Sequence, residues 1–218
     1  MLYILLGKQA SAKKAEKRIT GNLADTPHSP HSQRHLVSFL VLGIIVAALM
    51  HSMRGFIPLY AVDYFGVSEE TAAALMALFP IAGFWAAPLG GYLSDRVGRI
   101  PVMLIACFLS GLMVYSLNIV SYGLAFSAML VFIGTLDTIR MPTAEAYISV
   151  NTSEQRRSTM LGIYYFSGRE VGGLLTSAMG YLIDRIGFHS SFTIISISIV
   201  VVTLVSSVFL LGKQDKAY

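Results

Sequence analysis

Long stretches without a single charged side chain constrain this chain more than any other feature. No Asp, Glu, Lys or Arg occurs from Thr71 to Ser94, from Ile100 to Leu136, or from Ile186 to Gly212. A helix needs roughly 20 apolar residues to cross the hydrocarbon core of a bilayer. A buried helix of a soluble protein seldom stays apolar on every face over such a length. The uncharged stretches therefore predict an all-α membrane protein.

The composition also indicates a protein that lies in the lipid bilayer. Hydrophobic residues make up 55% of the 218 residues and charged residues 13%, whereas soluble domains carry about 25% charged residues. The mean hydropathy is +0.65. The single cysteine, Cys107, excludes a disulfide framework. A net charge of +4, spread along the chain, gives no argument for a nucleic-acid partner.

Six segments are long enough to span the membrane, so the predicted fold is a bundle of six transmembrane helices. Ser68, followed by Glu69 and Glu70, is typical of a helix N-terminus and begins the second span. The six predicted spans are 36–60, 70–93, 100–118, 122–148, 158–183 and 190–211.

The distribution of Lys and Arg predicts how these spans are oriented. Twelve of the sixteen lie before the first span, in the turns after the second and fourth spans, or in the C-terminal tail. The opposite side carries only Arg185, and the other three fall within spans. The positive-inside rule then predicts a multi-pass protein of the cell (inner) membrane with both termini in the cytoplasm.

The turn between the second and third spans has a specific pattern, GYLSDRVGR, which begins at Gly91. Gly98 allows the backbone angles of a short reversal, and Gly91 lets its helix approach a neighbour closely. Asp95 can compensate the positive N-terminal end of a nearby helix. Arg96 and Arg99 can hold the turn on the cytoplasmic side. This pattern between membrane-length helices resembles the signature loop of the major facilitator superfamily.

The resemblance covers about residues 36–211 and implies a secondary transporter that works by alternating access. It also implies that the five residues named in the signature loop form a conformational gating loop. Gly180–Gly187 echoes the loop on the outer side. The proline-glycine element found in the fifth helix of many exporters is absent, because Gly172 and Gly173 are followed by Leu174. In this family that element belongs mainly to the N-terminal half, so its absence here leaves both import and export open.

The N-terminal region differs in composition from the spans. Residues 8–35 lack a sustained apolar period and predict a basic cytoplasmic linker. The sequence LLGKQ at Leu5–Gln9 recurs at Leu210–Gln214, after the last span. The facilitator fold contains two parallel six-helix repeats, so the resemblance implies that this chain is a C-terminal half. The predicted domains are 1–35 (the end of a preceding helix plus the linker), 36–211 (the transmembrane domain) and 212–218 (a cytoplasmic tail).

Charged residues inside the predicted spans are the candidates for a substrate or proton pathway, because a charge within a bilayer is costly. Arg140 lies three residues after Asp137 and can reach it. An arginine can bind a carboxylate or phosphate through two parallel hydrogen bonds, and a desolvated acid such as Asp137 or Glu170 can exchange a coupling proton. The candidates are Arg54, Asp137, Arg140, Glu145, Arg169 and Glu170.

A purely structural interpretation stands beside this one. The six candidates are three arginines and three acids, so they can pair with one another and leave no net charge. Buried pairs of this kind are weak evidence of stabilisation. For Glu145, which lies toward the cytoplasmic end of its span, the structural interpretation is stronger.

The sequence predicts neither an enzyme nor a cofactor. No His, Cys, Asp or Glu cluster has metal-ligand spacing, and no nucleophile lies in a recognisable motif. We therefore expect a transporter of a small organic solute, coupled to protons, whose partners are the N-terminal half or a second copy of the chain. The alternative is a non-transporting or self-associating half-size membrane protein from a split gene. An open reading frame for six more spans upstream of Met1 would decide whether the chain is a fragment.

Overall fold

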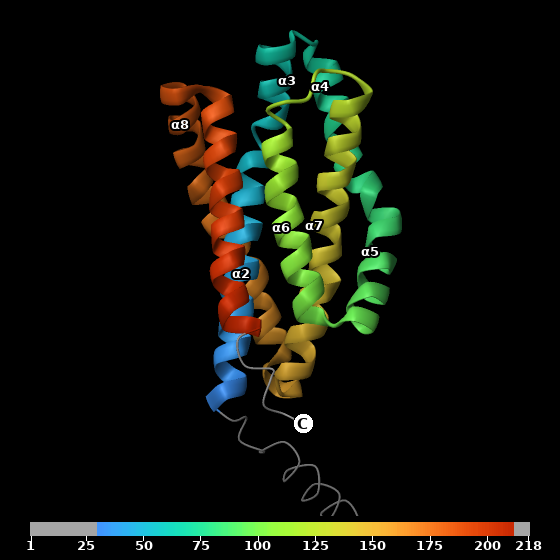
Figure 1. Cartoon of the computed structure of the whole chain (residues 1–218), viewed down its shortest axis with the longest axis vertical. Coiled ribbons are helices and arrows are strands. Elements are labelled where there is room, and N and C mark those ends of the chain that lie inside the picture. Colours follow the sequence, from blue (N-terminus) through green and yellow to red (C-terminus); the bar gives the residue numbers. More distant parts are fainter. Residues whose placement is uncertain (1–29, 212–218) are drawn as a thin grey trace, which may run out of the picture. The chain divides into compact units, whose positions relative to one another are not determined.

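The regular structure of the protein is helical throughout the region that the computed structural model describes, residues 30–211 (Figure 1). From His35 onward the chain forms one compact unit. The expected N-terminal stub, most of the linker and the tail lie outside the described residues. The helices are α2 (Pro30–Arg54), α3 (Ile57–Phe65), α4 (Glu69–Met76), α5 (Leu78–Val97), α6 (Arg99–Ser116), α7 (Leu124–Asn151) and α8 (Glu154–Leu211).

Within residues 30–211, five helical stretches are long and apolar enough to cross a membrane. The last of them, α8, has 58 residues, which would make a straight helix roughly 87 Å long at 1.5 Å per residue. It is not straight, because Gly187 has φ 79° and ψ 169° and interrupts the helical conformation. Gly187 thus divides α8 into two arms, each with the length of one span. An all-α membrane fold with six apolar segments is confirmed.

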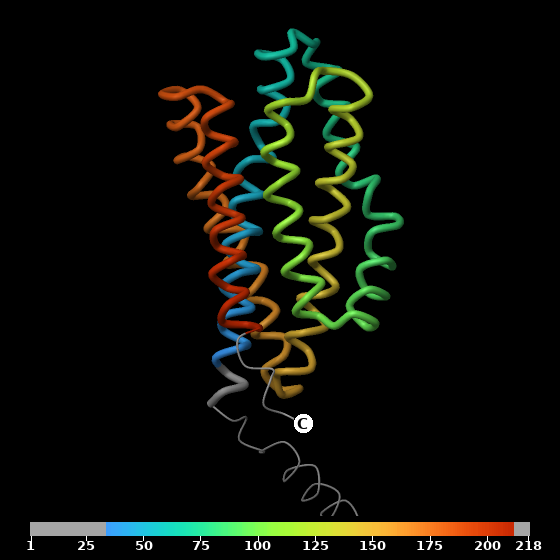
Figure 2. Tube along the Cα trace, viewed as in Figure 1, coloured from blue at the N-terminus to red at the C-terminus, as the bar shows by residue number. Residues whose placement is uncertain are grey.

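The two arms of α8 run in opposite directions (Figure 2). In the first arm, Gly168 lies beside Ala47 and Gly180 beside Phe56, so this arm runs parallel to α2. The second arm contacts α6 through hydrogen bonds from Asn118 to the carbonyl of His189 (3.2 Å) and from Ser196 to the carbonyl of Gly111 (2.8 Å).

These last two contacts pair a late residue of one helix with an early residue of the other, so the second arm is antiparallel to α6. Because α2 and α6 run side by side in the same direction (Figure 1), a reversal at the break in α8 is the only arrangement that satisfies both sets of contacts. A single glycine with a positive φ therefore makes a whole interhelical turn.

The first two predicted spans are interrupted in the structure, which corrects the prediction of continuous helices over 36–60 and 70–93. The helix α2 starts earlier, at Pro30, and ends at Arg54. Pro58 lacks the N–H that would bond the carbonyl of Arg54, and its ring crowds that carbonyl. Pro80 has the same relation to Met76, where α4 ends. In both cases the helix stops four residues before a proline.

The turns expected from the sequence are present. Ser68 is the N-cap of α4, and its side chain accepts a hydrogen bond from the backbone N–H of Thr71 at 3.3 Å. Gly98, with φ 100°, connects α5 to α6 in a single residue. Pro101 lies in the first turn of α6, where its missing N–H is not needed.

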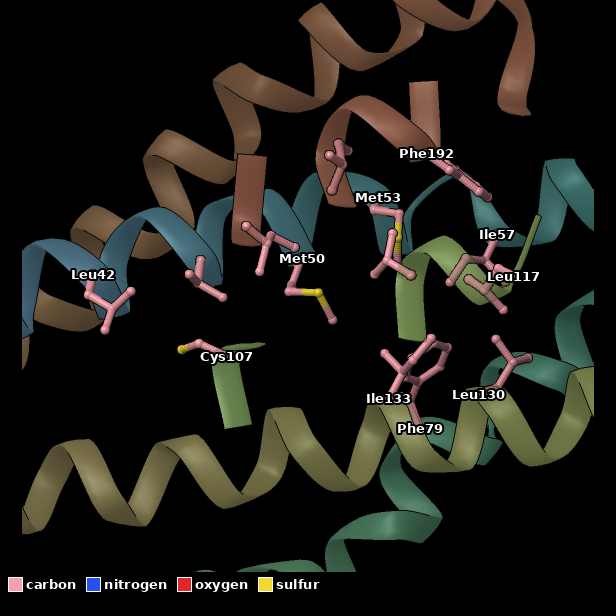
Figure 3. Packing of buried hydrophobic residues seen from close by; sticks show 14 of the residues in the cluster. Leu42, Met50, Met53, Ile57, Phe79, Cys107, Leu117, Leu130, Ile133 and Phe192 are labelled. Carbon is pink, nitrogen blue, oxygen red and sulfur yellow. The ribbon is translucent and has the colours of Figure 1, made fainter. Parts of the chain in front are cut away.

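The core of the unit lies between α2, α6 and α7 (Figure 3). Met50 and Met53 of α2 point toward Leu117, just after the end of α6, and Ile133 of α7, and all four are at most 2% exposed. The outward faces are also apolar: Phe84, for example, is 83% exposed. Large apolar faces on the outside of such long helices are typical of a protein whose solvent is lipid.

Small residues bring α5 and α7 into close contact, but at a different position from the one predicted. A Cβ atom at Gly90 would lie 2.9 Å from Cα of Ile139, and one at Gly134 would lie 2.9 Å from the carbonyl oxygen of Phe79. A Cβ atom at Gly91, by contrast, would meet no atom of another described element within 4 Å. Within the described residues the close helix approach is thus made at Gly90, and the approach expected at Gly91 stays a prediction.

Candidate functional site

Three of the predicted intramembrane charges form one cluster. Arg54, at the last residue of α2, donates a hydrogen bond from Nη2 to Oδ2 of Asp137 at 2.5 Å. Arg140 donates from Nη2 to the other carboxylate oxygen of Asp137. Asp137 therefore accepts from two guanidinium groups at once, one within its own helix and one from α2.

The members of this cluster are buried to different degrees. The side chain of Arg140 is 5% exposed, that of Asp137 22% and that of Arg54 34%. The guanidinium of Arg54 also lies over the ring of Phe79, 4.7 Å from its centre, which is a favourable position for a cation. Nε and Nη1 of Arg140 and Nε of Arg54 have no hydrogen-bond partner among the described residues.

The cluster forms part of the wall of a cavity of about 340 Å³. Three elements line the cavity: the C-terminal half of α2, the middle of α7 and the first arm of α8. The lining residues are Ala47, His51, Arg54, Asp137, Arg140, Met141, Tyr164, Tyr165, Gly168 and Arg169.

Four of the six candidates from the sequence thus line one cavity, and two lie outside its lining. Arg169 joins the three residues of the cluster. Glu145 is exposed and accepts a hydrogen bond from the hydroxyl of Tyr165. Glu170 is exposed and does not line the cavity. Adjacent residues on a helix point about 100° apart, so the inward position of Arg169 turns Glu170 away.

The two tyrosines of the lining were not predicted as site residues, although the sequence carries a signal for them. Tyr164 and Tyr165 precede Gly168 and Arg169 by four residues each. Residues four apart share a helix face, so a cavity position for Arg169 implies one for Tyr165. The contact of Tyr165 with Glu145, by contrast, joins two helices and has no local signature.

The predicted gating loop lies at the C-terminal end of α5 and lines a second cavity of about 390 Å³. Asp95, Gly98 and Arg99 contribute to its wall together with Tyr147 and Asn151 near the end of α7. The loop therefore faces the end of the helix that carries Asp137.

The charged side chains of the loop have few contacts of their own. The guanidinium of Arg96 lies 5.2 Å from the ring centre of Tyr92. Asp95 is exposed and makes no hydrogen bond or ion pair with any residue in the range 30–211. Gly91 has open space around it. A compensating contact between Asp95 and a helix N-terminus is not present in this structure.

A bundle of apolar, membrane-length helices around a charged cavity indicates a multi-pass membrane protein. The family model of the Major Facilitator Superfamily matches residues 39–217. The chain belongs to this superfamily, whose members are transporters.

Curated relatives and solved structures of this superfamily resemble the chain over part of their own length. The "Multidrug resistance protein MdtG" of Klebsiella pneumoniae (strain 342) is 23% identical over 163 residues, which cover 73% of this chain and 39% of that protein. An "MFS-type transporter" of Gibberella moniliformis is 26% identical over 177 residues, or 74% of this chain and 43% of the relative.

The crystal structure of the POT family transporter PepTSo superposes with a TM-score of 0.70 at 17% identity, covering 88% of this chain and 39% of the other. A structure of the peptide transporter POT in complex with alafosfalin gives a TM-score of 0.61 at 22% identity. It covers 81% of this chain and 39% of the other. At these identities the superpositions show the fold alone. The chain spans about two fifths of the length of the relatives it matches.

Proposed function

We propose that the chain is the C-terminal six-helix half of a proton-coupled secondary transporter that moves a small organic solute by alternating access. The observation that carries the proposal is the cluster of Arg54, Asp137 and Arg140 in the wall of a cavity between apolar helices. Charges at such positions are costly, so their presence there is by default evidence for a functional site. The short coverage of full-length relatives supports the assignment as a half.

Either an N-terminal half or a second copy of the chain completes the cavity in this proposal. The outer face of α5 offers a surface for such a partner. A Cβ atom at Gly83 or Gly91 would meet no atom of another described element within 4 Å, and Ala87, between them on the same face, is exposed. A smooth face of small residues lets another helix approach closely in a membrane.

In this proposal Asp137, which lies between two cations, is the group that binds the coupling proton. When a proton binds the carboxylate, the charge that holds Arg54 is lost, and Arg54 is the more exposed of the two arginines. Protonation would therefore open the cluster on the α2 side and leave Arg140 in place. Glu170 remains a second candidate for the proton pathway, and the loop from Gly91 to Arg99 is the proposed gate.

Solute-driven proton movement tests this proposal. The purified chain is reconstituted in liposomes that contain a pH-sensitive dye, its oligomeric state is measured, and dipeptides, organic acids and lipophilic dyes are added in turn. We expect at least one class to move protons in the assembled form, and Asp137→Asn to abolish that movement. Asp184→Asn, a change in an exposed acid outside the cavity, is the control.

Two results would contradict the proposal. Proton movement that persists in Asp137→Asn would remove Asp137 from the coupling. An assembled form that moves none of the solutes would favour the non-transporting membrane protein instead. We expect no vectorial transport from the chain unless it pairs with a second half.

The orientation in the membrane is tested by labelling single cysteines. We expect Val67→Cys and His189→Cys, in a Cys107→Ser background, to react with a membrane-impermeant reagent from outside the cell, and Ser158→Cys to be protected. Val67 connects α3 to α4 and His189 follows the break in α8, so both lie at the end of the unit opposite Gly98. Ser11→Cys, outside the described residues, should also be protected. Labelling of that position from outside would overturn the predicted orientation.

A further inference from the structure

The cavity is more positive than the sequence suggests. In the sequence the six intramembrane charges balance, but only four of them line the cavity. Those four are Arg54, Asp137, Arg140 and Arg169. Three guanidinium groups and one carboxylate leave an excess of two positive charges on the wall.

The acids that would balance this excess lie elsewhere. Glu145 is exposed, does not line the cavity and is engaged by the hydroxyl of Tyr165. Glu170 is exposed and points away from the lining. The carboxylate that remains, Asp137, has one oxygen bonded to each of two arginines. A cation that entered the cavity would therefore meet three arginines and one acid that is already engaged.

Guanidinium groups of the wall still have donors to offer. Arg169 is exposed and makes no hydrogen bond or ion pair with any residue from 30 to 211. Nε of Arg54 and Nε and Nη1 of Arg140 also have no partner within the same residues, but these atoms are buried, so Arg169 is the guanidinium of the lining that is free to donate to a ligand. Guanidinium donors in a fixed fork match the two oxygens of a carboxylate or phosphate, so an anionic group is the ligand that the unused donors fit.

We infer that this cavity binds the anionic group, a carboxylate or a phosphate, of the transported solute, and that Arg169 is the arginine that contacts it. The inference rests on the proposed transport function and names its substrate class. A cavity of about 340 Å³ admits a small organic molecule. The anion could belong to a soluble solute or to a lipid headgroup, because both carry the same chemistry.

Three probes of similar size but different charge test the inference. The purified full chain in phosphatidylcholine nanodiscs is titrated with benzoate, benzamide and benzylamine in a calorimeter. Hydrogen bonds to a charged group contribute more than neutral ones, so we expect benzoate to bind about tenfold or more tightly than benzamide. Benzylamine should bind more weakly still, because it is repelled by the wall.

Matched arginine variants locate the binding. Arg169→Gln is expected to weaken benzoate binding about tenfold, and Arg169→Lys less, because it keeps the charge but loses the planar fork. Arg185→Gln removes the same charge from the same arm of α8, outside the lining, and should leave binding unchanged. Arg169 is exposed, so its variants should fold, and their thermal unfolding is measured alongside.

The outcomes separate this inference from the transport proposal. Tighter binding of benzamide or benzylamine than of benzoate would overturn the assignment of an anionic solute. The proposal that the cavity binds a solute would still hold. An equal loss of benzoate affinity in Arg169→Gln and Arg185→Gln would mean that benzoate responds only to the general surface charge. That result would overturn the role of Arg169. Absence of benzoate binding overturns the inference, and the proton-movement assay still decides transport. If phosphatidylglycerol in the nanodisc competes with benzoate, the anion site stands and its ligand includes a lipid headgroup.

Discussion

Asp137→Leu is expected to lower the free energy of unfolding by about 3–5 kcal/mol, because it leaves Arg140 buried without a counter-charge. The side chain of Arg140 is 5% exposed, so it cannot reach water without moving α7. Arg54, which is more exposed, can turn into the cavity. Chemical unfolding in detergent micelles, followed by the fluorescence of the single tryptophan, Trp85, measures the loss.

The double variant Asp137→Leu/Arg140→Met separates structure from function. Replacing a buried ion pair by apolar side chains of similar volume is often neutral or stabilising, so we expect the double variant to recover most of the lost stability. Transport should not recover. Recovery of both would show that the charges only pair with each other, and the site assignment would then fail. Asp184→Asn, in an exposed acid, should change stability by no more than about 0.5 kcal/mol.

The second large effect is expected at two neighbouring glycines of α5. Gly90→Ala should destabilise the unit by about 1–3 kcal/mol, since its Cβ would lie 2.9 Å from Cα of Ile139 and 3.0 Å from the carbonyl oxygen of the same residue. Both are backbone atoms, which cannot give way as a flexible side chain can. Gly91→Ala meets no atom within 4 Å and should stabilise the helix by up to about 1 kcal/mol.

The two glycine variants are controls for each other, because they make the same change one position apart. Thermal unfolding of both in the same detergent gives the comparison. Equal destabilisation, or a greater loss in Gly91→Ala, would mean that α5 is rotated about its axis relative to the structure. The position of Ile139 next to Arg140 makes this contact relevant to the site as well, because a shift of α7 moves the charged cluster.

Sequence patterns predicted the elements that local chemistry determines. Ser68 caps a helix as its hydroxyl predicts, and Gly98 makes the single-residue turn that its freedom in φ allows. The contact between Asp137 and Arg140 follows from their spacing of three. The breaks before Pro58 and Pro80 could also have been predicted, because a proline removes a specific hydrogen bond four residues back.

The remaining features depend on how helices meet and have no local pattern. The contact of Arg54 with Asp137 joins residues 83 positions apart, and the contact of Tyr165 with Glu145 joins two helices. For a related reason, the sequence could not predict that Gly90, and not Gly91, packs against α7. The helix α5 is apolar on nearly every face, so no hydrophobic stripe indicates which side is buried.

The proline breaks give the α3–α4 segment a mechanical property. At both of its ends, after Arg54 and after Met76, the backbone hydrogen bond that would stiffen the junction is already absent. The segment is therefore a flap between two weakened hinges, which keep fewer backbone hydrogen bonds than a continuous helix. The bonds from Phe56 to Met53 and from Ile81 to Ala77 still cross these hinges. Tyr60, fully buried and bonded to the carbonyl of Leu117 at 3.3 Å, holds the flap in its present position. One hinge begins at Arg54, so a tilt of the flap first displaces the residue that holds Asp137 from α2.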